Sequence, residues 1–149
     1  MGTAMHRVAT YDEVDQSPKG LVDRALNAGV ALDLELSDEV RLAETASALM
    51  RLAEASPNAI VMAASSEADV LAAAVTRCVG RSTPADEGAP VILVDMILAT
   101  GVQLSATVHR LRQSGVTVRR AVVVAADPEA LIRTRSDLAI DVDALRSLA

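Results

Sequence analysis

The feature that most constrains the fold is a run of branched apolar residues in the second half of the chain. Residues 91–94 are Val, Ile, Leu and Val, with Pro90 before them and Asp95 after them. A short run that is apolar at every position is typical of a strand buried on both faces, as in a parallel sheet. We therefore predict a strand that starts at Val91 and ends on the carboxylate of Asp95.

A loop of small residues and then a helix follow this strand. The loop contains Ala99, Thr100 and Gly101, and residues 104–112 have helical spacing that stops at Ser114-Gly115. A helix that starts directly after such a loop points its unpaired backbone N–H groups and the positive end of its dipole at the loop. The stretch therefore predicts an anion site, and a phosphate is the expected ligand.

Val91 to Leu104 resembles the signature of type I phosphoribosyltransferases, in which an apolar strand runs into an acidic residue and a Thr-Gly phosphate loop. The resemblance implies that Asp95 contacts the ribose hydroxyls of the ligand. Met96 stands where many members of that family carry a second acid. The loop residues implied to hold the 5′-phosphate are Ala99, Thr100, Gly101, Val102 and Gln103. An ordinary strand-loop-helix turn of an α/β protein is the alternative interpretation.

Helices and strands are predicted to alternate along the rest of the chain. We expect helices that begin at Ser17-Pro18, at 37–39, at Val70 and at Asp127-Pro128, and a closing helix at 143–148. We expect further strands at 30–36, 59–64, 116–126 and 138–142.

Strands separated by helices of this length imply parallel crossovers. The expected fold class is therefore α/β, with a single doubly wound, mainly parallel sheet and helices on both faces, as in phosphoribosyltransferases. At this length one domain, 1–149, is expected, with 1–17 as a candidate flexible arm.

The loop after the strand at 59–64 departs from the family that the chain resembles. In those enzymes this loop binds the diphosphate through small residues and Gly. Here residues 65–69 contain no Gly and carry two carboxylates, Glu67 and Asp69, and like charges repel at contact range. We interpret Ser65, Ser66 and Glu67 as a degenerate diphosphate loop. The two acids have a second interpretation, as solvent-facing residues in the first turn of a helix.

The segment between Gly80 and Val91 is also short compared with that family. The family has a strand and a long mobile hairpin here, and the hairpin closes over the substrate. Residues 81–90 are polar, acidic and turn-forming, and they are too few for both elements. We expect no lid, and hence neither water exclusion nor a lid cation for the departing diphosphate.

Composition excludes several other classes of protein. The net charge is −6, with one lysine and one aromatic residue, so we expect no nucleic-acid partner. His6 and His109 lack partners at ligand spacing, so no metal site is assigned, and Cys78 is expected to be a buried, inert thiol. The single cysteine excludes a disulfide framework within one chain, which predicts a reducing, cytoplasmic compartment. No apolar run is long enough to cross a bilayer, so no membrane partner is expected.

These observations leave three functions open. In the preferred hypothesis, the domain binds a 5-phosphoribosyl compound or nucleotide, has little or no transferase activity and acts in a regulatory or partner-dependent role. In the alternative, it is an active nucleobase phosphoribosyltransferase that uses phosphoribosyl diphosphate with magnesium and borrows a cation from another subunit. A further alternative is an interaction or dimerisation domain without a ligand. No catalytic residue is assigned, and a homodimer with a role in nucleotide metabolism is expected.

Overall fold

The centre of the molecule is a four-stranded parallel sheet. The computed structural model describes residues 17–55, 59–79 and 90–148 of the chain. The strands are β1 (Ile60–Ala63), β2 (Val91–Leu98), β3 (Val118–Ala126) and β4 (Asp141–Ser147), in the order β1-β2-β3-β4. All three neighbouring pairs are parallel, which confirms the expected single parallel sheet.

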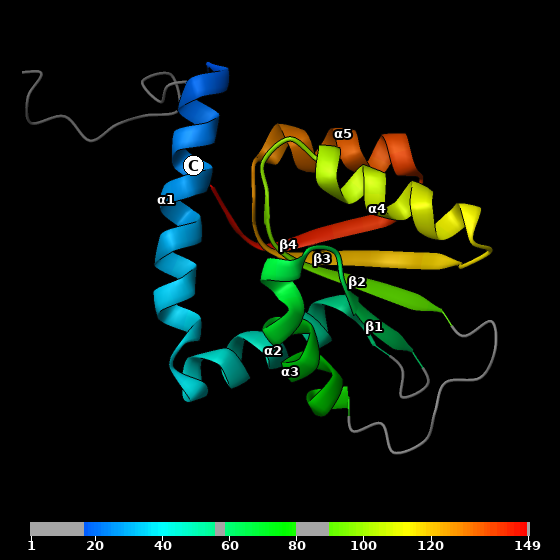
Figure 1. The fold of residues 1–149 in the computed structure, drawn as a ribbon, viewed down its shortest axis with the longest axis horizontal. Coiled ribbons are helices and arrows are strands. Elements are labelled where there is room, and N and C mark those ends of the chain that lie inside the picture. Colours follow the sequence, from blue (N-terminus) through cyan, green and yellow to red (C-terminus); the bar gives the residue numbers. More distant parts are fainter. Residues whose placement is uncertain (1–16, 56–58, 80–89, 149) are drawn as a thin grey trace, which may run out of the picture.

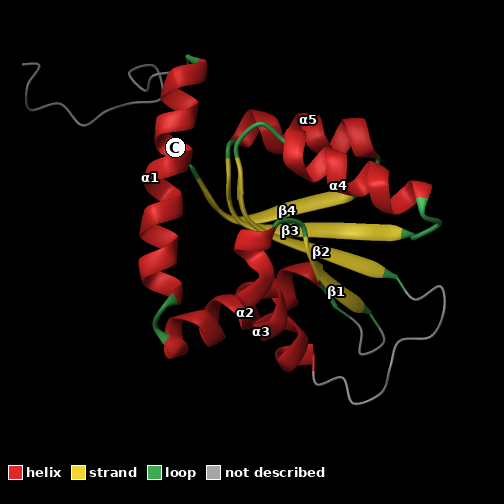
Figure 2. Ribbon diagram, in the orientation of Figure 1, coloured by secondary structure: helices red, strands yellow, loops and turns green. Residues whose placement is uncertain are grey.

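Helices cover both faces of this sheet (Figures 1 and 2). The helices are α1 (Pro18–Leu36), α2 (Glu39–Ala53), α3 (Asp69–Val79), α4 (Val102–Gln113) and α5 (Pro128–Leu138), and a 3₁₀ turn, η3 (Ser66–Ala68), precedes α3. Ile92 and Val94 of β2 join the core under α2 and α3, whereas Val91 and Leu93 join the core under α4 and α5. The expected helices on both faces are therefore confirmed. In Figure 1, α1 stands across the carboxyl ends of the strands.

The connections between the strands do not all have the same hand. The chain steps across the sheet in one direction from β1 to β4, yet α3 packs on the opposite face from α4 and α5. The connection through α3 therefore has the opposite hand to the other two. About 98% of such connections in proteins are right-handed, so a parallel sheet with connections of both hands is unusual.

Side-chain caps start three of the helices where the sequence predicts. Ser17 Oγ accepts a hydrogen bond from Gly20 N at 3.0 Å, and Asp38 Oδ1 accepts one from Val40 N at 2.9 Å. Asp127 Oδ2 accepts a hydrogen bond from Ala130 N at 3.1 Å. Each cap satisfies a backbone donor that the helix itself leaves unpaired.

The strand predicted at 30–36 is wrong, because these residues form the second half of α1. Leu32 is buried and Leu36, four residues later, packs against the same core, whereas Leu34 is 72% exposed. A spacing of four between buried residues is helical, and the alternation of apolar and acidic residues concealed it. Gly29 lies within this helix.

The bounds of the last strand also differ from the prediction, and the closing helix is wrong. α5 continues to Leu138, and the final strand occupies Asp141–Ser147, where a helix was expected from Asp143. Val142 is fully buried and pairs with Ala121, and Ala144 pairs with Val123. Pairing along β3 thus decides the conformation of a segment whose local pattern is ambiguous.

Candidate ligand-binding site

A cavity of about 390 Å³ lies beside the carboxyl ends of the strands, between the sheet and α1. Three segments that are distant in the sequence form its wall: α1, the start of the segment after β1, and the end of β2 with the loop and first turn of α4. The lining residues are Leu21, Val22, Ala25, Leu26, Gly29, Asp33, Ser65, Glu67, Asp95, Met96, Ile97, Leu98, Ala99, Thr100, Gly101, Gln103 and Leu104. This edge is where open parallel α/β sheets bind ligands.

The first turn of α4 opens on this cavity without a side-chain cap. Its N-cap residue is Gly101, at φ 86°, and no side chain caps the helix there, unlike α1, α2 and α5. The nearest substitute is a long hydrogen bond of 3.3 Å from Val102 N to Thr100 Oγ1. A helix start of this kind attracts an anion, since its N–H groups and its dipole are not yet compensated.

Helix α5 supports this loop from behind. A Cβ atom on Gly101 would overlap Oγ1 of Thr134, which is buried. Arg133 donates a hydrogen bond from Nη2 to the carbonyl oxygen of Thr100 at 2.9 Å. The sequence did not indicate either α5 residue, because only the packing of α5 against α4 brings them to the loop.

Asp95 lies inside β2 and not at its end, because the strand continues to Leu98. The side chain accepts two hydrogen bonds at Oδ1, from Ser65 Oγ at 2.7 Å and from Met96 N at 2.9 Å. Within the described part of the chain, Oδ2 accepts none. Burial raises the pKa of Asp95, the two hydrogen bonds oppose this shift, and the charge of Glu67 adds to it.

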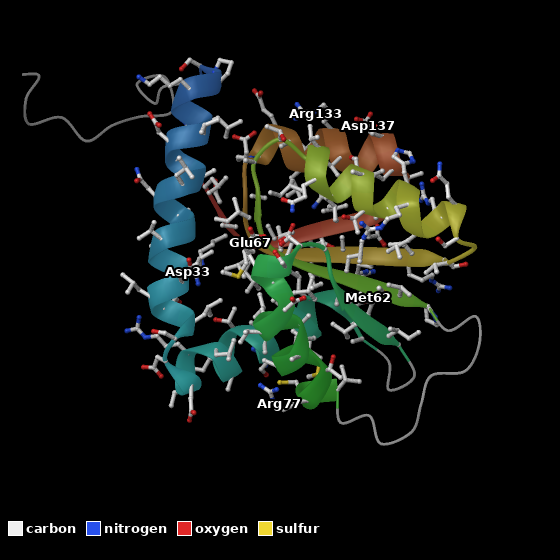
Figure 3. All side chains as sticks on the ribbon, in the orientation of Figure 1. Asp33, Met62, Glu67, Arg77, Arg133 and Asp137 are labelled. Atoms are coloured by element: carbon white, nitrogen blue, oxygen red, sulfur yellow. The ribbon has the colours of Figure 1, made fainter. Side chains whose placement is uncertain are left out.

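Three carboxylates line the cavity and come from three different elements. They belong to Asp33 of α1, Glu67 of η3 and Asp95 of β2, and Figure 3 shows the first two on neighbouring segments. Of the residues that the structure describes, no Lys, Arg or His lines the cavity. The described residues also include no group of three or more His, Cys, Asp or Glu side chains that could hold a metal ion.

The sequence-predicted site residues fall mainly on this cavity. Among the phosphate-loop residues, all but Val102 line it, and in the predicted diphosphate loop Ser65 and Glu67 line it while Ser66 does not. The missed contributors lie on α1, where Val22 and Leu26 leave half or more of their surface exposed. Their helical spacing was visible in the sequence, but it indicated a core face.

The predictions for Cys78 and for the missing lid have different outcomes. Cys78 is exposed in the last turn of α3, so its prediction as a buried thiol is wrong. The absence of a lid concerns residues 81–89, which lie outside the described residues. Within the described ranges no helix is long and apolar enough to cross a bilayer.

The solved structures that share this fold include two phosphoribosyltransferases. Orotate phosphoribosyltransferase from Aeropyrum pernix matches with a TM-score of 0.63 and 20% identity, over 76% of this chain and 75% of that chain. Adenine phosphoribosyltransferase from Thermoanaerobacter pseudethanolicus matches with a TM-score of 0.63 and 18% identity, over 76% of this chain and 83% of that chain. Neither a protein-family model nor a curated protein matches the sequence. The chain therefore has a fold of the type I phosphoribosyltransferase kind, as the sequence predicted.

Proposed function

We propose that this domain binds a 5-phosphoribosyl compound or nucleotide and has little or no transferase activity. The 5′-phosphate binds at Ala99, Thr100, Gly101, Val102 and Gln103, and Asp95 accepts hydrogen bonds from the ribose hydroxyls. The observation that carries this proposal is the uncapped start of α4, which opens on a cavity lined also by Asp95, whose Oδ2 accepts no hydrogen bond from the described residues. The fold likeness to two phosphoribosyltransferases supports the same class of ligand.

The charge of the cavity argues against efficient transfer. A diphosphate leaving group needs cations, and the described lining supplies three carboxylates and no basic side chain. Magnesium would therefore have to arrive with phosphoribosyl diphosphate.

We propose a regulatory or partner-dependent role in nucleotide metabolism. The second candidate is an active nucleobase transferase that works as a homodimer with a cation from the partner subunit, and the same fold likeness favours it.

Calorimetry with a charge variant tests the phosphate loop. Gln103→Glu puts a carboxylate at the loop, where it suits the helix dipole but repels a phosphate. The expected loss of affinity for ribose 5-phosphate is about 30-fold, or roughly 2 kcal/mol. Gln113→Glu makes the same change at the other end of α4 and is the matched control, with an expected change below about threefold.

The same assay separates the remaining functions. Phosphoribosyl diphosphate and nucleoside monophosphates are titrated with and without magnesium, and diphosphate release is measured with uracil, adenine and orotate. Release at an enzymatic rate would establish the transferase and reject our preferred hypothesis. Absence of binding by every phosphate compound would leave only an interaction domain.

A further inference from the structure

Helix α1 carries a row of apolar side chains that the described elements leave exposed. The row consists of residues four apart in the sequence: Val22, Leu26, Val30 and Leu34. Each of them leaves between 51% and 72% of its surface exposed. They are four of the eight large apolar residues that are exposed in the described part of the chain. Single exposed apolar residues are ordinary, whereas a continuous row of them indicates an interaction surface.

This apolar row lies on an outer side of the molecule and reaches the cavity. In Figure 1 the sheet and the other helices lie to one side of α1. Leu32 of α1 is buried in the core on that side. Val22 and Leu26 line the cavity although more than half of each is exposed, whereas Val30 and Leu34 do not line it. A partner that binds the apolar row would therefore also border the cavity.

The charges of α1 do not suit a membrane surface. A helix that lies on a membrane usually carries several Lys or Arg side chains on its polar face. The exposed charged residues of α1 are Lys19, Asp23 and Asp33, so acids outnumber the single base. Anionic lipid head groups would repel such a helix. A protein surface is therefore the better partner for the apolar row.

The spacing of the apolar row fits a second copy of the same helix. Two copies of α1 can pack antiparallel about a twofold axis at the midpoint of the row. Leu26 then meets Val30 of the partner subunit, and Val22 meets Leu34 of the partner subunit. Both contacts are apolar, and the symmetry repeats each of them. Rows of residues four apart are also the ridges through which helices most often pack.

The charges at the two ends of α1 favour the antiparallel direction. Lys19 lies in the first turn, Asp38 follows the last turn, and both are exposed. Antiparallel packing puts Lys19 at the same end as Asp38 of the partner subunit, whereas parallel packing puts like charges together. Asp23 and Asp33 lie on opposite sides of the apolar row in a helix of 3.6 residues per turn, so the pairing does not set them against each other.

We propose that a second copy of this chain docks on the apolar row of α1, with the two α1 helices antiparallel. This is the surface of the homodimer that we expect from the sequence, and its pairing needs no ligand. A helix of 19 residues is about 28 Å long and roughly 10 Å wide, so one side of it covers roughly 280 Å². Stable interfaces bury about 800 Å² on each partner. We therefore expect a weak dimer with a dissociation constant in the micromolar range.

Sedimentation velocity over a range of protein concentrations measures this dimer. Val30→Glu puts a charge in the middle of the contact and should weaken association by at least about tenfold, because the carboxylate would be buried without a partner. Ile132→Glu is the matched control on α5, since Ile132 is 66% exposed and Val30 is 64% exposed. In the control, association should stay within about twofold of the wild type. Thermal unfolding of both variants checks that the fold is intact.

A mixing experiment tests which residues meet. Leu26→Lys should also weaken the association of the protein with itself. When the Leu26→Lys and Val30→Glu proteins are mixed, antiparallel pairing sets the introduced lysine against the introduced carboxylate at one contact and keeps the apolar pair at the other. The mixture should therefore associate at least about tenfold more tightly than either variant alone. In parallel pairing the two introduced charges would not meet, and the mixture would associate no better.

The outcomes decide this inference without any ligand. A dimer that Val30→Glu weakens, that Ile132→Glu leaves intact and that the mixture restores supports it. A wild-type protein that is monomeric up to about 1 mM overturns it, as does a dimer that Val30→Glu leaves unchanged or that Ile132→Glu weakens equally. Failure of the mixture to recover association overturns the antiparallel pairing. Because no phosphate compound is present, none of these results bears on the proposed ligand site, which is tested separately by calorimetry.

Discussion

The loops that follow β1 and β2 lie at the same edge of the sheet and line the same cavity, but their chemistry is opposite. After β2, the loop is neutral and built from small residues, with Gly101 in the left-handed region and an uncapped helix behind it. After β1, the chain enters a 3₁₀ turn with an acid, and Ser65 donates its hydroxyl to Asp95. One loop therefore leads into a helix without a side-chain cap, and the other brings the carboxylate of Glu67 to the cavity.

The largest expected effect concerns the backbone of the loop after β2. Gly101→Ala should lower the free energy of unfolding by about 3 kcal/mol, because an L residue is strained at φ 86° and its Cβ would overlap Thr134. Urea unfolding measures this loss. The double variant Gly101→Ala/Thr134→Ala should recover the part of the lost free energy of unfolding that is due to the overlap. The matched control in the other loop is Ser66→Ala, with an expected change within about 0.5 kcal/mol; equal losses at both positions would remove the distinction between the loops.

The next largest effect is expected from a substitution that reverses the charge of the acidic residue in the loop after β1. Glu67→Lys changes the cavity by two charge units and should tighten binding of inorganic diphosphate by about tenfold, or roughly 1.4 kcal/mol. Asp69→Lys makes the same change two residues later, at an exposed position that does not line the cavity, and should have little effect. Calorimetry without magnesium is the measurement. Unchanged affinity in Glu67→Lys would mean that the acidic loop does not limit anion binding.

A smaller effect is expected on the free energy of unfolding when Asp95, which lies between the two loops, is replaced. Asp95→Asn keeps an oxygen for both hydrogen bonds and removes a buried charge, so the variant should be about 1 kcal/mol more stable at neutral pH.

The pH dependence of this difference follows from the raised pKa of Asp95. The folded state takes up the proton more readily than the unfolded chain, so the wild type loses stability as the pH rises from the ordinary aspartate pKa through the folded value. The advantage of Asp95→Asn should therefore shrink in acid. Urea unfolding of both proteins across this pH range measures the difference in free energy of unfolding between them. A difference that does not change with pH would contradict the buried charge of Asp95 as its cause.

The smallest effect is expected at an ion pair outside the cavity, and its pH dependence is opposite to that of Asp95. Arg146 of β4 donates two hydrogen bonds of 3.2 Å to Glu35 of α1, and the first of the causes that lower the pKa of Glu35 is this hydrogen bonding. Because both side chains are partly exposed, Glu35→Gln should cost about 0.5 kcal/mol. The loss should be present above the ordinary glutamate pKa and disappear as the pH falls through the lowered value. Unfolding curves measure it, and unchanged affinity for ribose 5-phosphate is the internal control.

The sequence predicted best those parts of the molecule that local patterns determine. The apolar run at 91–94 and the small residues after it identified β2, the loop and α4, and the Ser and Asp caps marked three helix starts. The segments at 30–36 and 143–147 were assigned wrongly, since pairing and packing with distant elements determine them. Asp33 could not be placed in a cavity, because that requires knowing how α1 stands against β2. The roles of Asp95 and the phosphate-loop residues, and the homodimer, stay predictions.

The connection through α3, whose hand is opposite to that of the other two connections, has a consequence for protein engineering. A strand added outside β1 would remove this difference in hand, since α3 would then lead to that strand by a path of the same hand as the other two connections before the chain returned to β2. In the described chain no strand occupies that position. Replacing residues 80–89 with a strand and a hairpin is therefore a rational route to graft a cover onto this domain, and β1 offers the graft a ready template of backbone hydrogen-bonding groups.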